Sequence, residues 1–512
     1  MSRIENLLIP HRTKLVQTVI TSAQRLVALI LVTLLFIATA LPVAASSNVD
    51  NSNTHSSTSL QPSTDNKSFY SANFWQGSIT RHTRDDQQQL LTSNELKLGK
   101  DIRRLAINPS NQTLLATDYL SDNLILVDLK AWSAIKTIPV GKRPFGVVFQ
   151  ALHNRFWISL FEAHQLIAVE DGDIVLTLNT ADTPRGLAIT KDNRLLVTHA
   201  MTGQVSIYDA IPKQPRLLKT ITLHTQQLDD DFKSQGLPRL LDDIAISPDG
   251  QEAWLPHVLW NFDHEFQFQS TVFPAVSIID LAPNNERELV DQRKQLFKTI
   301  NILDNKNRTR IVSNPHDAEF SSSGAKAYIT LAGSDDILVF DRSRSLSRST
   351  KNKSNKRHRR KKHQGGAKAI QIYRHTPGQN PRGLLINGEQ LFVQNAVNQT
   401  ISIFNRGGDH PFDRVSLTQA EWASSSTIND GTIQRGRALF HSGRTDANPE
   451  YPIAGDFWMS CNSCHLDGFN FTNRYLMESQ KKDKKRDART GHPGLKHMVT
   501  GNAVTDFINI IQ

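Results

Sequence analysis

The feature that most limits how this chain can fold is a repeat of about forty residues in its central part. Each copy has a short apolar strand, a polar turn such as Ser247-Pro248-Asp249-Gly250, and further strands that end near Asp or Asn. The strands alternate apolar and polar residues, and the turns carry the Gly, Asp and Asn that tight hairpins need. This self-similarity predicts the four-stranded blades of a β-propeller, and a β-sandwich would not show it. The visible copies begin at Leu105, Arg143, Thr183, Leu241, Asn314 and Asn380.

One more blade is needed to close the ring, and we expect residues 70–104 to supply it together with residues near position 414. The repeats resemble the YVTN family of seven-bladed propellers over roughly residues 99–415. The resemblance implies a mainly β fold with the propeller at residues 71–425. It implies no activity, because propellers host many unrelated functions.

The N-terminus has the pattern of an export signal. Arg25 precedes an unbroken apolar run, Leu26–Ala45, in which Val43 and Ala45 are small residues at the offsets that a signal peptidase requires. The run is also close to the ~20 residues that span a bilayer, so a membrane anchor is the alternative to a signal peptide over residues 1–45. Both interpretations place the rest of the chain outside the cytoplasm, and we expect a periplasmic location.

Two polar segments are predicted to be disordered. Residues 46–70 are rich in Ser, Asn and Thr and are expected to form a linker. Residues 342–368 contain twelve Lys and Arg and no acidic residue, so the rest of the chain is near neutral although the net charge is +10. Export argues against nucleic acid as the partner of this basic insertion. Anionic lipid or an acidic protein is expected instead, and membrane association through this loop or the N-terminal segment stays open.

A second pattern places charged residues at the mouth of the propeller channel. A proline followed by a polar residue precedes the first strand in several repeats, and the loop after the second strand opens on the same face. We therefore expect a basic mouth that attracts an anion, such as a carboxylate, a haem propionate or an acidic partner. Alternatively, these side chains brace the loops, or the histidines bind a metal. The candidates are Arg185, His199, Arg239, His257, His316 and Arg382.

Both cysteines of the chain, Cys461 and Cys464, lie three positions apart, and His465 follows directly. CxxCH is the attachment motif of c-type haem. Two thiols one turn apart can bond the two vinyl groups of one porphyrin, and the adjacent imidazole then binds the iron. A zinc site would need four ligands, and a thioredoxin-like redox pair would need a βαβ context that is absent from the neighbouring sequence. The spacing therefore predicts one covalent haem with its iron.

The residues around this motif resemble the cytochrome c and di-haem peroxidase superfamily. Arg435, Gly436, Leu439 and Phe440 match the helix that precedes CxxCH in that superfamily, and "CNSCHLDG" matches its "CxSCHxDG". The resemblance implies a small all-α cytochrome c domain over residues 426–512, and a truncated form of that domain is an alternative. An apolar stripe supports a last helix that packs on the first, formed by Val504, Phe507, Ile508 and Ile511.

The second axial ligand of the iron stays open. Met498 lies where a cytochrome c methionine does, and His497, His492 and Met477 are alternatives, as is an open site. We expect an exported electron-transfer protein with a periplasmic redox partner. One alternative is an oxidoreductase, peroxidase-like or dehydrogenase-like, with its substrate at the propeller mouth. The single CxxCH argues against peroxidase chemistry. The other alternative is a protein-docking module.

Overall fold

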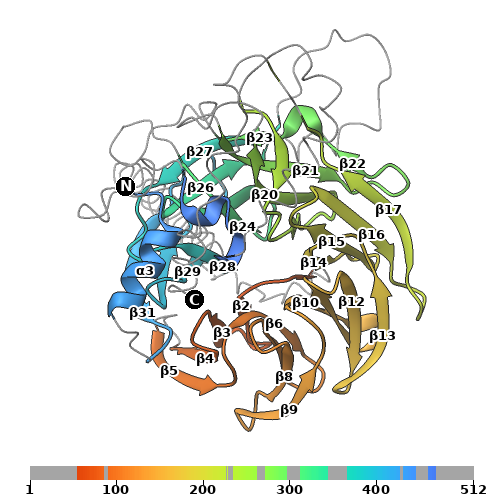
Figure 1. Ribbon diagram of the computed structural model, residues 1–512. Coiled ribbons are helices and arrows are strands. Elements are labelled where there is room, and N and C mark those ends of the chain that lie inside the picture. Colours follow the sequence, from red (N-terminus) through yellow and green to blue (C-terminus); the bar gives the residue numbers. More distant parts are fainter. Residues whose placement is uncertain are drawn as a thin grey trace, which may run out of the picture. The chain divides into compact units, whose positions relative to one another are not determined.

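Seven β-sheets surround a common centre, which confirms the predicted seven-bladed propeller (Figure 1). The computed structural model describes residues 55–85, 90–225, 228, 234–261, 271–296, 312–343, 366–426, 431–444 and 459–468. Among these residues, no helix has both the length and the apolar character that crossing a membrane requires.

The blades follow one another along the chain, each running from the centre outward. The first three are β2 (Leu60–Pro62), β3 (Ser68–Asn73), β4 (Ser78–Arg84) and β5 (Leu90–Lys97); β6 (Ile102–Asn108), β7 (Thr113–Asp118), β8 (Asn123–Asp128) and β9 (Ser133–Pro139); and β10 (Pro144–Gln150), β11 (Arg155–Leu160), β12 (Gln165–Glu170) and β13 (Asp173–Asn179).

The fourth and fifth blades carry additional strands. The fourth contains β14 (Pro184–Ile189), β15 (Arg194–His199), β16 (Gln204–Asp209) and β17 (Arg216–Thr222), with β1 (His55–Ser56) on its inner edge. The fifth contains β18 (Leu237–Arg239), β19 (Ala245–Ile246), β20 (Glu252–Trp260), β21 (Val272–Asp280), β22 (Arg287–Glu288) and β23 (Lys294–Gln295).

The last two blades have four strands each. They are β24 (Pro315–Phe320), β25 (Lys326–Leu331), β26 (Asp336–Asp341) and β27 (Lys368–Tyr373); and β28 (Pro381–Asn387), β29 (Gln390–Asn395), β30 (Thr400–Asn405) and β31 (Ser416–Ala423).

The burial of a strand depends on its place in the blade. Strand β10 is buried along its whole length, whereas most residues of the outermost strands β9 and β17 are exposed. The turns match their residues: Gly250 has a φ of 70°, and its N–H donates to the Ser247 carbonyl at 2.7 Å. Apolar side chains of adjacent blades pack against each other and form the core between the sheets.

The linker prediction is wrong from residue 55 onward. Strand β1 pairs with β14, and the Ser57 N–H donates to the Leu187 carbonyl at 2.7 Å. Thr58 forms a bridge with Leu105, and Leu60 is 1% exposed. This polar segment is ordered because its backbone pairs with the innermost strands of other blades, so it needs no alternating apolar face.

The closure of the ring also differs from the prediction. The blade β2–β5 is built entirely from residues 60–97, and β31 belongs to the blade that begins with β28. Side-chain and backbone contacts join these two blades instead of a shared sheet. Asn73 donates to the Ser424 carbonyl at 3.0 Å, and the Trp422 indole donates to Ser93 at 2.6 Å.

Removing the inner segment is therefore expected to destabilise the propeller. A chain that begins at residue 64 should unfold at a lower temperature than a chain that begins at residue 54. The loss should be at least the roughly 2–5 kcal/mol that follows deletion of one buried leucine, because Leu60 is lost together with its strand. Thermal unfolding followed by circular dichroism checks this. Equal midpoints would show that residues 55–63 contribute nothing to the ring.

The basic insertion is shorter than predicted. Arg342 is 1% exposed and pairs with Glu252 at 2.9 Å, and Lys368 begins β27. Residues 344–365 lie outside the described residues, as do residues 1–54, which include the predicted export signal, and the last 44 positions from 469 to 512.

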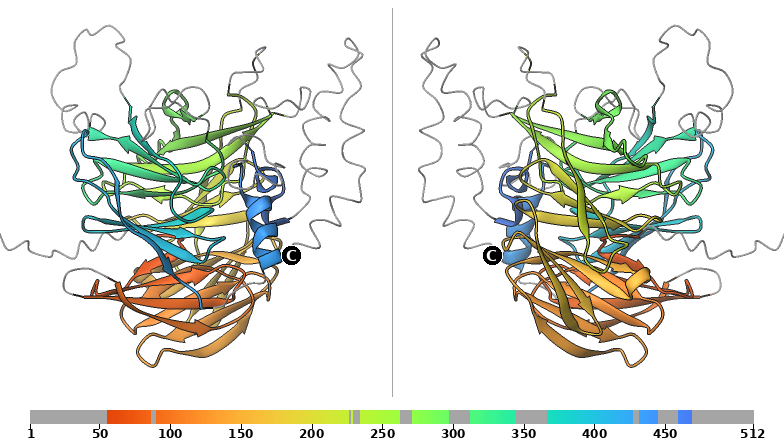
Figure 2. Two further views of the ribbon diagram at one scale, coloured as in Figure 1. Left: turned by 90° about the vertical axis from the view of Figure 1, so that its left-hand side faces the viewer. Right: turned by 90° about the vertical axis from the view of Figure 1, so that its right-hand side faces the viewer.

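The predicted helix before the CxxCH motif is present as α3 (Gly431–His441). Figure 2 shows it beside one face of the propeller. The motif itself begins a 3-10 turn, Cys461–Ser463, and a second short turn covers Leu466–Gly468. The rest of the predicted cytochrome domain, including Met477, His492, His497, Met498 and the last helix, lies outside the described residues.

Candidate functional site

In five of the seven blades, one residue of the innermost strand faces the propeller channel. It is the second residue of the strand, and it lies within a register shift that all five strands share. In the fifth blade the equivalent residue is Asp242, which stands three residues before β19 begins at Ala245. We call this set the inner ring: Arg103, Phe145, Arg185, Asp242, His316 and Arg382.

The inner ring corrects the predicted site in two places. The Pro–X pattern aligns Arg239 with Arg185, but Arg239 lies on β18 and donates to the Pro238 carbonyl at 2.8 Å. The aligned residue is Asp242. The Pro–X pattern does not include Arg103, because Ile102 stands where four other blades have proline.

The residue after each inner-ring position forms a second layer. Gly146 occupies it in the third blade, where an added Cβ would lie 2.2 Å from the Arg185 carbonyl oxygen. Arg104, Asp243 and Asp317 occupy it in other blades and bring ionisable side chains into the channel. Arg104 pairs with Asp243, and both side chains are at most 3% exposed.

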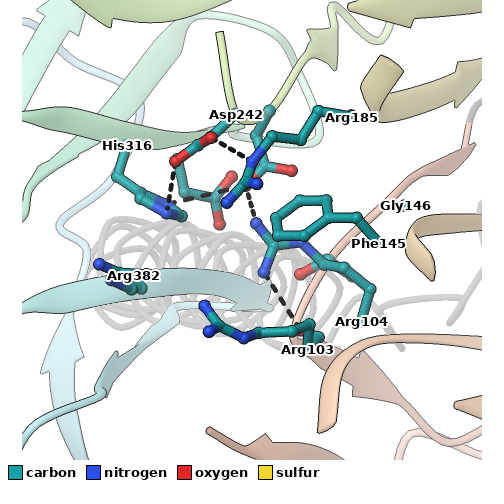
Figure 3. Close-up of polar contacts among 12 residues, drawn as sticks. Arg103, Arg104, Phe145, Gly146, Arg185, Asp242, His316 and Arg382 are labelled. Atoms are coloured by element: carbon teal, nitrogen blue, oxygen red, sulfur yellow. Dashed lines mark hydrogen bonds and ion pairs between the residues drawn. The ribbon is translucent and has the colours of Figure 1, made fainter. Parts of the chain in front are cut away.

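The two layers form one buried ionic network (Figure 3). Arg185 pairs with Asp242, and its guanidinium lies 3.7 Å above the Phe145 ring. His316 Nε2 lies 3.3 Å from Asp242, and its Nδ1 lies 3.7 Å from Asp243. Burial, and then the nearby arginines, hold the pKa of His316 well below its usual value, so the ring is neutral.

The anion at this mouth is a side chain of the protein itself, Asp467. Arg185 Nη2 lies 2.7 Å from Asp467 Oδ2, and Arg103 Nη1 lies 3.1 Å from Oδ1. Arg382 Nη1 approaches Oδ1 to 3.9 Å. Burial alone would raise the pKa of Asp467, but Arg185, Arg103 and Arg382 hold it well below its usual range. Three members of the inner ring thus bind the residue two positions after His465.

Polar contacts also hold the CxxCH turn on the mouth. The Trp260 indole N–H donates to the Ser463 carbonyl at 2.9 Å. Asn314 donates to Ser460 at 2.8 Å and accepts from the Ser463 hydroxyl at 2.7 Å. Within the turn, the His465 N–H donates to the Cys461 carbonyl at 2.9 Å. These contacts fix the position of the turn against β20 and the loop before β24.

An apolar cluster lies beside the ion pairs. Leu466 is 1% exposed and packs with Tyr119, Phe145 and Phe161, and Cys464 lies against the same cluster. Full burial of one leucine side chain contributes about 1.5–3 kcal/mol. Leu466 and Asp467 thus insert side by side, one into an apolar and one into a charged part of the mouth.

Helix α3 adds a further contact. The His441 ring stacks on Trp75 with centroids 5.0 Å apart, and His441 Nδ1 lies 3.2 Å from Arg382 Nη2. Burial lowers the pKa of His441 well below its usual value, and Arg382 adds to this shift. A neutral imidazole can accept the hydrogen bond from Arg382. His441 was not among the residues predicted from the sequence.

His199 and His257 do not join the inner ring, and their contacts match the bracing alternative. His199 Nε2 lies 2.8 Å from Ser206 Oγ, and its Nδ1 lies 3.1 Å from the Asp182 carbonyl. His257 Nδ1 lies 2.9 Å from the Leu255 carbonyl. Among the described residues, no group of three or more His, Cys, Asp or Glu side chains is arranged to hold a metal ion.

His257 is expected to make the protein sensitive to acid. Burial, with a contribution from Arg293, lowers its pKa to about 3, against about 6.5 when unfolded. Between these values the unfolded state binds more protons, so stability falls as the pH falls, by about 1.4 kcal/mol per unit. His257→Asn should remove this contribution to the pH dependence of the free energy of unfolding, measured by urea unfolding between pH 6 and pH 4. The exposed His224→Asn is the control, and an unchanged slope in both variants would contradict the assignment.

The donor set fits a c-type haem better than a redox-active dithiol. Cys461 and Cys464 are free and partly buried. Burial raises the pKa of both thiols, that of Cys464 to about 12. A dithiol oxidoreductase needs the opposite shift, because its thiolate is the nucleophile. Thioether attachment requires two thiols and an imidazole on one turn, which are the groups present here.

Comparison with known proteins confirms the fold alone. No family model matches the chain, and no curated protein matches it. Hydrazine synthase of Kuenenia stuttgartiensis is 16% identical, with a TM-score of 0.53 over 68% of this chain and 94% of that one. A Lactobacillus plantarum protein is 16% identical, with a TM-score of 0.49 over 70% and 97%. The dihydro-heme d1 dehydrogenase NirN in complex with DHE is 15% identical, with a TM-score of 0.44 over 71% and 66%.

Proposed function

We propose that this protein is an exported electron-transfer protein with one c-type haem, covalently attached to Cys461 and Cys464 and with His465 as an iron ligand. The observation that carries the proposal is the CxxCH turn, seated on the mouth of the propeller channel by Asp467. The motif supplies the chemistry, and the contacts of Asp467 hold the motif at a fixed place on the propeller. A haem bound there would supply one-electron redox chemistry.

The residues around the turn have separate roles in this proposal. Asp467 and its arginines fix the direction in which the chain leaves His465. Leu466 and the adjoining apolar cluster keep water from the propeller side of the turn. Two arginines of the ionic network beneath it are paired with buried carboxylates, Arg104 with Asp243 and Arg185 with Asp242, so the turn does not face a bare positive mouth.

The remaining parts of the proposal concern residues outside the described ranges. We propose that residues 1–45 direct export to the periplasm, as a signal peptide or as a membrane anchor. Met498 is the proposed second axial ligand, with His497, His492 and Met477 as its alternatives. The partner is proposed to be a periplasmic redox protein and not a nucleic acid. The basic insertion could add contact with anionic lipid.

The test is to produce the full chain in a host that exports it and attaches c-type haem. A pyridine haemochrome assay should give one c-type haem per chain. Small reductants should reduce this haem, and the oxidised spectrum should show the weak near-infrared band of methionine ligation, which Met498→Ala should remove. A high-spin spectrum that shifts when peroxide is added would instead support an oxidoreductase. A protein without covalent haem would refute the proposal.

A further inference from the structure

Three guanidinium groups in the mouth converge on one carboxylate, and they contact both of its oxygens. Arg185 lies 2.7 Å from Oδ2 of Asp467, whereas Arg103 and Arg382 lie 3.1 Å and 3.9 Å from Oδ1. All four side chains are at most 3% exposed. Charge-assisted hydrogen bonds of this kind are the usual means by which proteins bind a carboxylate ligand.

The propeller builds this cradle without help from the segment that carries Asp467. The arginines come from the innermost strands β6, β14 and β28, and each has a further contact of its own. Arg103 pairs with Asp101 at 2.7 Å, and Arg382 Nε donates to Asn380 at 2.6 Å. Arg185 pairs with Asp242 and lies on the Phe145 ring. The cradle is therefore preorganised, which lowers the cost of binding a ligand.

The cradle also has donors that Asp467 does not use. Arg185 Nη1 and the Tyr119 hydroxyl are buried, and neither has a hydrogen-bond partner among the described residues. Tyr119 is 1% exposed, and its ring lies 4.9 Å from the Arg103 guanidinium. A buried donor without a partner is costly, so these two groups indicate capacity for further acceptor atoms.

We propose that the propeller mouth is a carboxylate-binding site, that Asp467 is its resident ligand, and that a small monocarboxylate can take its place. The CxxCH turn is then held on the propeller partly by a contact that a free carboxylate can imitate. This inference concerns the propeller and Asp467, and it does not depend on whether a haem is attached.

The test is chemical rescue in the full chain. Asp467→Gly removes the carboxylate and leaves a space of acetate size, so the thermal midpoint should fall by several degrees. Sodium acetate should restore at least half of this loss, with a half-maximal effect on the order of 10 mM for so small a ligand. Sodium chloride of equal ionic strength should not. The wild type should respond equally to both salts.

Two matched variants show whether the effect belongs to the cradle. Asp467→Asn fills the same space with an uncharged group, so it should lose stability and show no acetate response. Asp467→Gly with Arg185→Gln should also show none. Rescue that survives without Arg185, or equal effects of acetate and chloride on Asp467→Gly, would overturn the inference. If that variant is recovered only unfolded, refolding yields in the two salts replace the midpoint, and equal yields overturn it as well.

Discussion

Replacing Arg185 by alanine is expected to lower the free energy of unfolding by about 3–5 kcal/mol, which is the range for removing one partner of a buried ion pair. Arg185 is fully buried and pairs with both Asp242 and Asp467. Burial alone would lower the pKa of its guanidinium, but Asp242 and Asp467 raise it above its usual value. Without this cation, two buried carboxylates lose their nearest positive charge, and the ring of Phe145 loses the nearer of the two guanidinium groups over it.

Thermal and urea unfolding of Arg185→Ala measure this loss. The matched control is Arg216→Ala, which removes an arginine that pairs with Asp209 at a similar distance of 2.7 Å but is 71% exposed. The control should change stability by no more than about 0.5 kcal/mol, because exposed pairs contribute little. Similar small losses in both variants would contradict the buried network at the channel mouth.

Replacing both Cys461 and Cys464 by alanine is expected to abolish covalent haem while the propeller still folds. The chain has no other cysteine, so no thiol can substitute for these two. The blades do not depend on them: Cys464 contacts the apolar cluster only from its edge, and Cys461 is likewise partly buried. Haem staining after denaturing electrophoresis should fall from the wild-type signal to background.

The circular dichroism spectrum of the double variant should remain that of a β protein, which separates loss of haem from loss of fold. Each single variant keeps one thiol and should keep at most a minor share of the covalent haem. Wild-type staining in the double variant would contradict the attachment site. Loss of staining together with loss of the β spectrum would show that the cysteines also support the fold.

The blades could be predicted from the sequence because their information is local. Each repeat carries its own alternating strands and turn residues, such as Ser247–Gly250, and the helix at Gly431–His441 has its own motif. The closure of the ring could not be predicted in this way. Residues 55–59 are polar, and they become ordered by backbone pairing with β14 and with Leu105, far along the chain.

Only part of the candidate site could be predicted, because the sequence reveals local patterns and not contacts between distant residues. The Pro–X pattern includes Arg185, His316 and Arg382, which the folded chain brings together at the mouth, but it excludes Arg103 and misaligns Arg239. Counting back from the turn that follows each inner strand would have found Arg103 and Asp242. Asp467 gave no such signal, because its partner Arg103 lies 364 residues earlier. Only the folded ring brings them together.

The most direct test of the central claim is the mass of the proteolytic fragment that contains Cys461 and Cys464, taken from the exported protein under reducing conditions. The account predicts a fragment heavier by one haem, with both thiols unavailable to an alkylating reagent. A fragment of unmodified mass, with both thiols alkylated, would contradict it and leave the propeller without the haem proposed here.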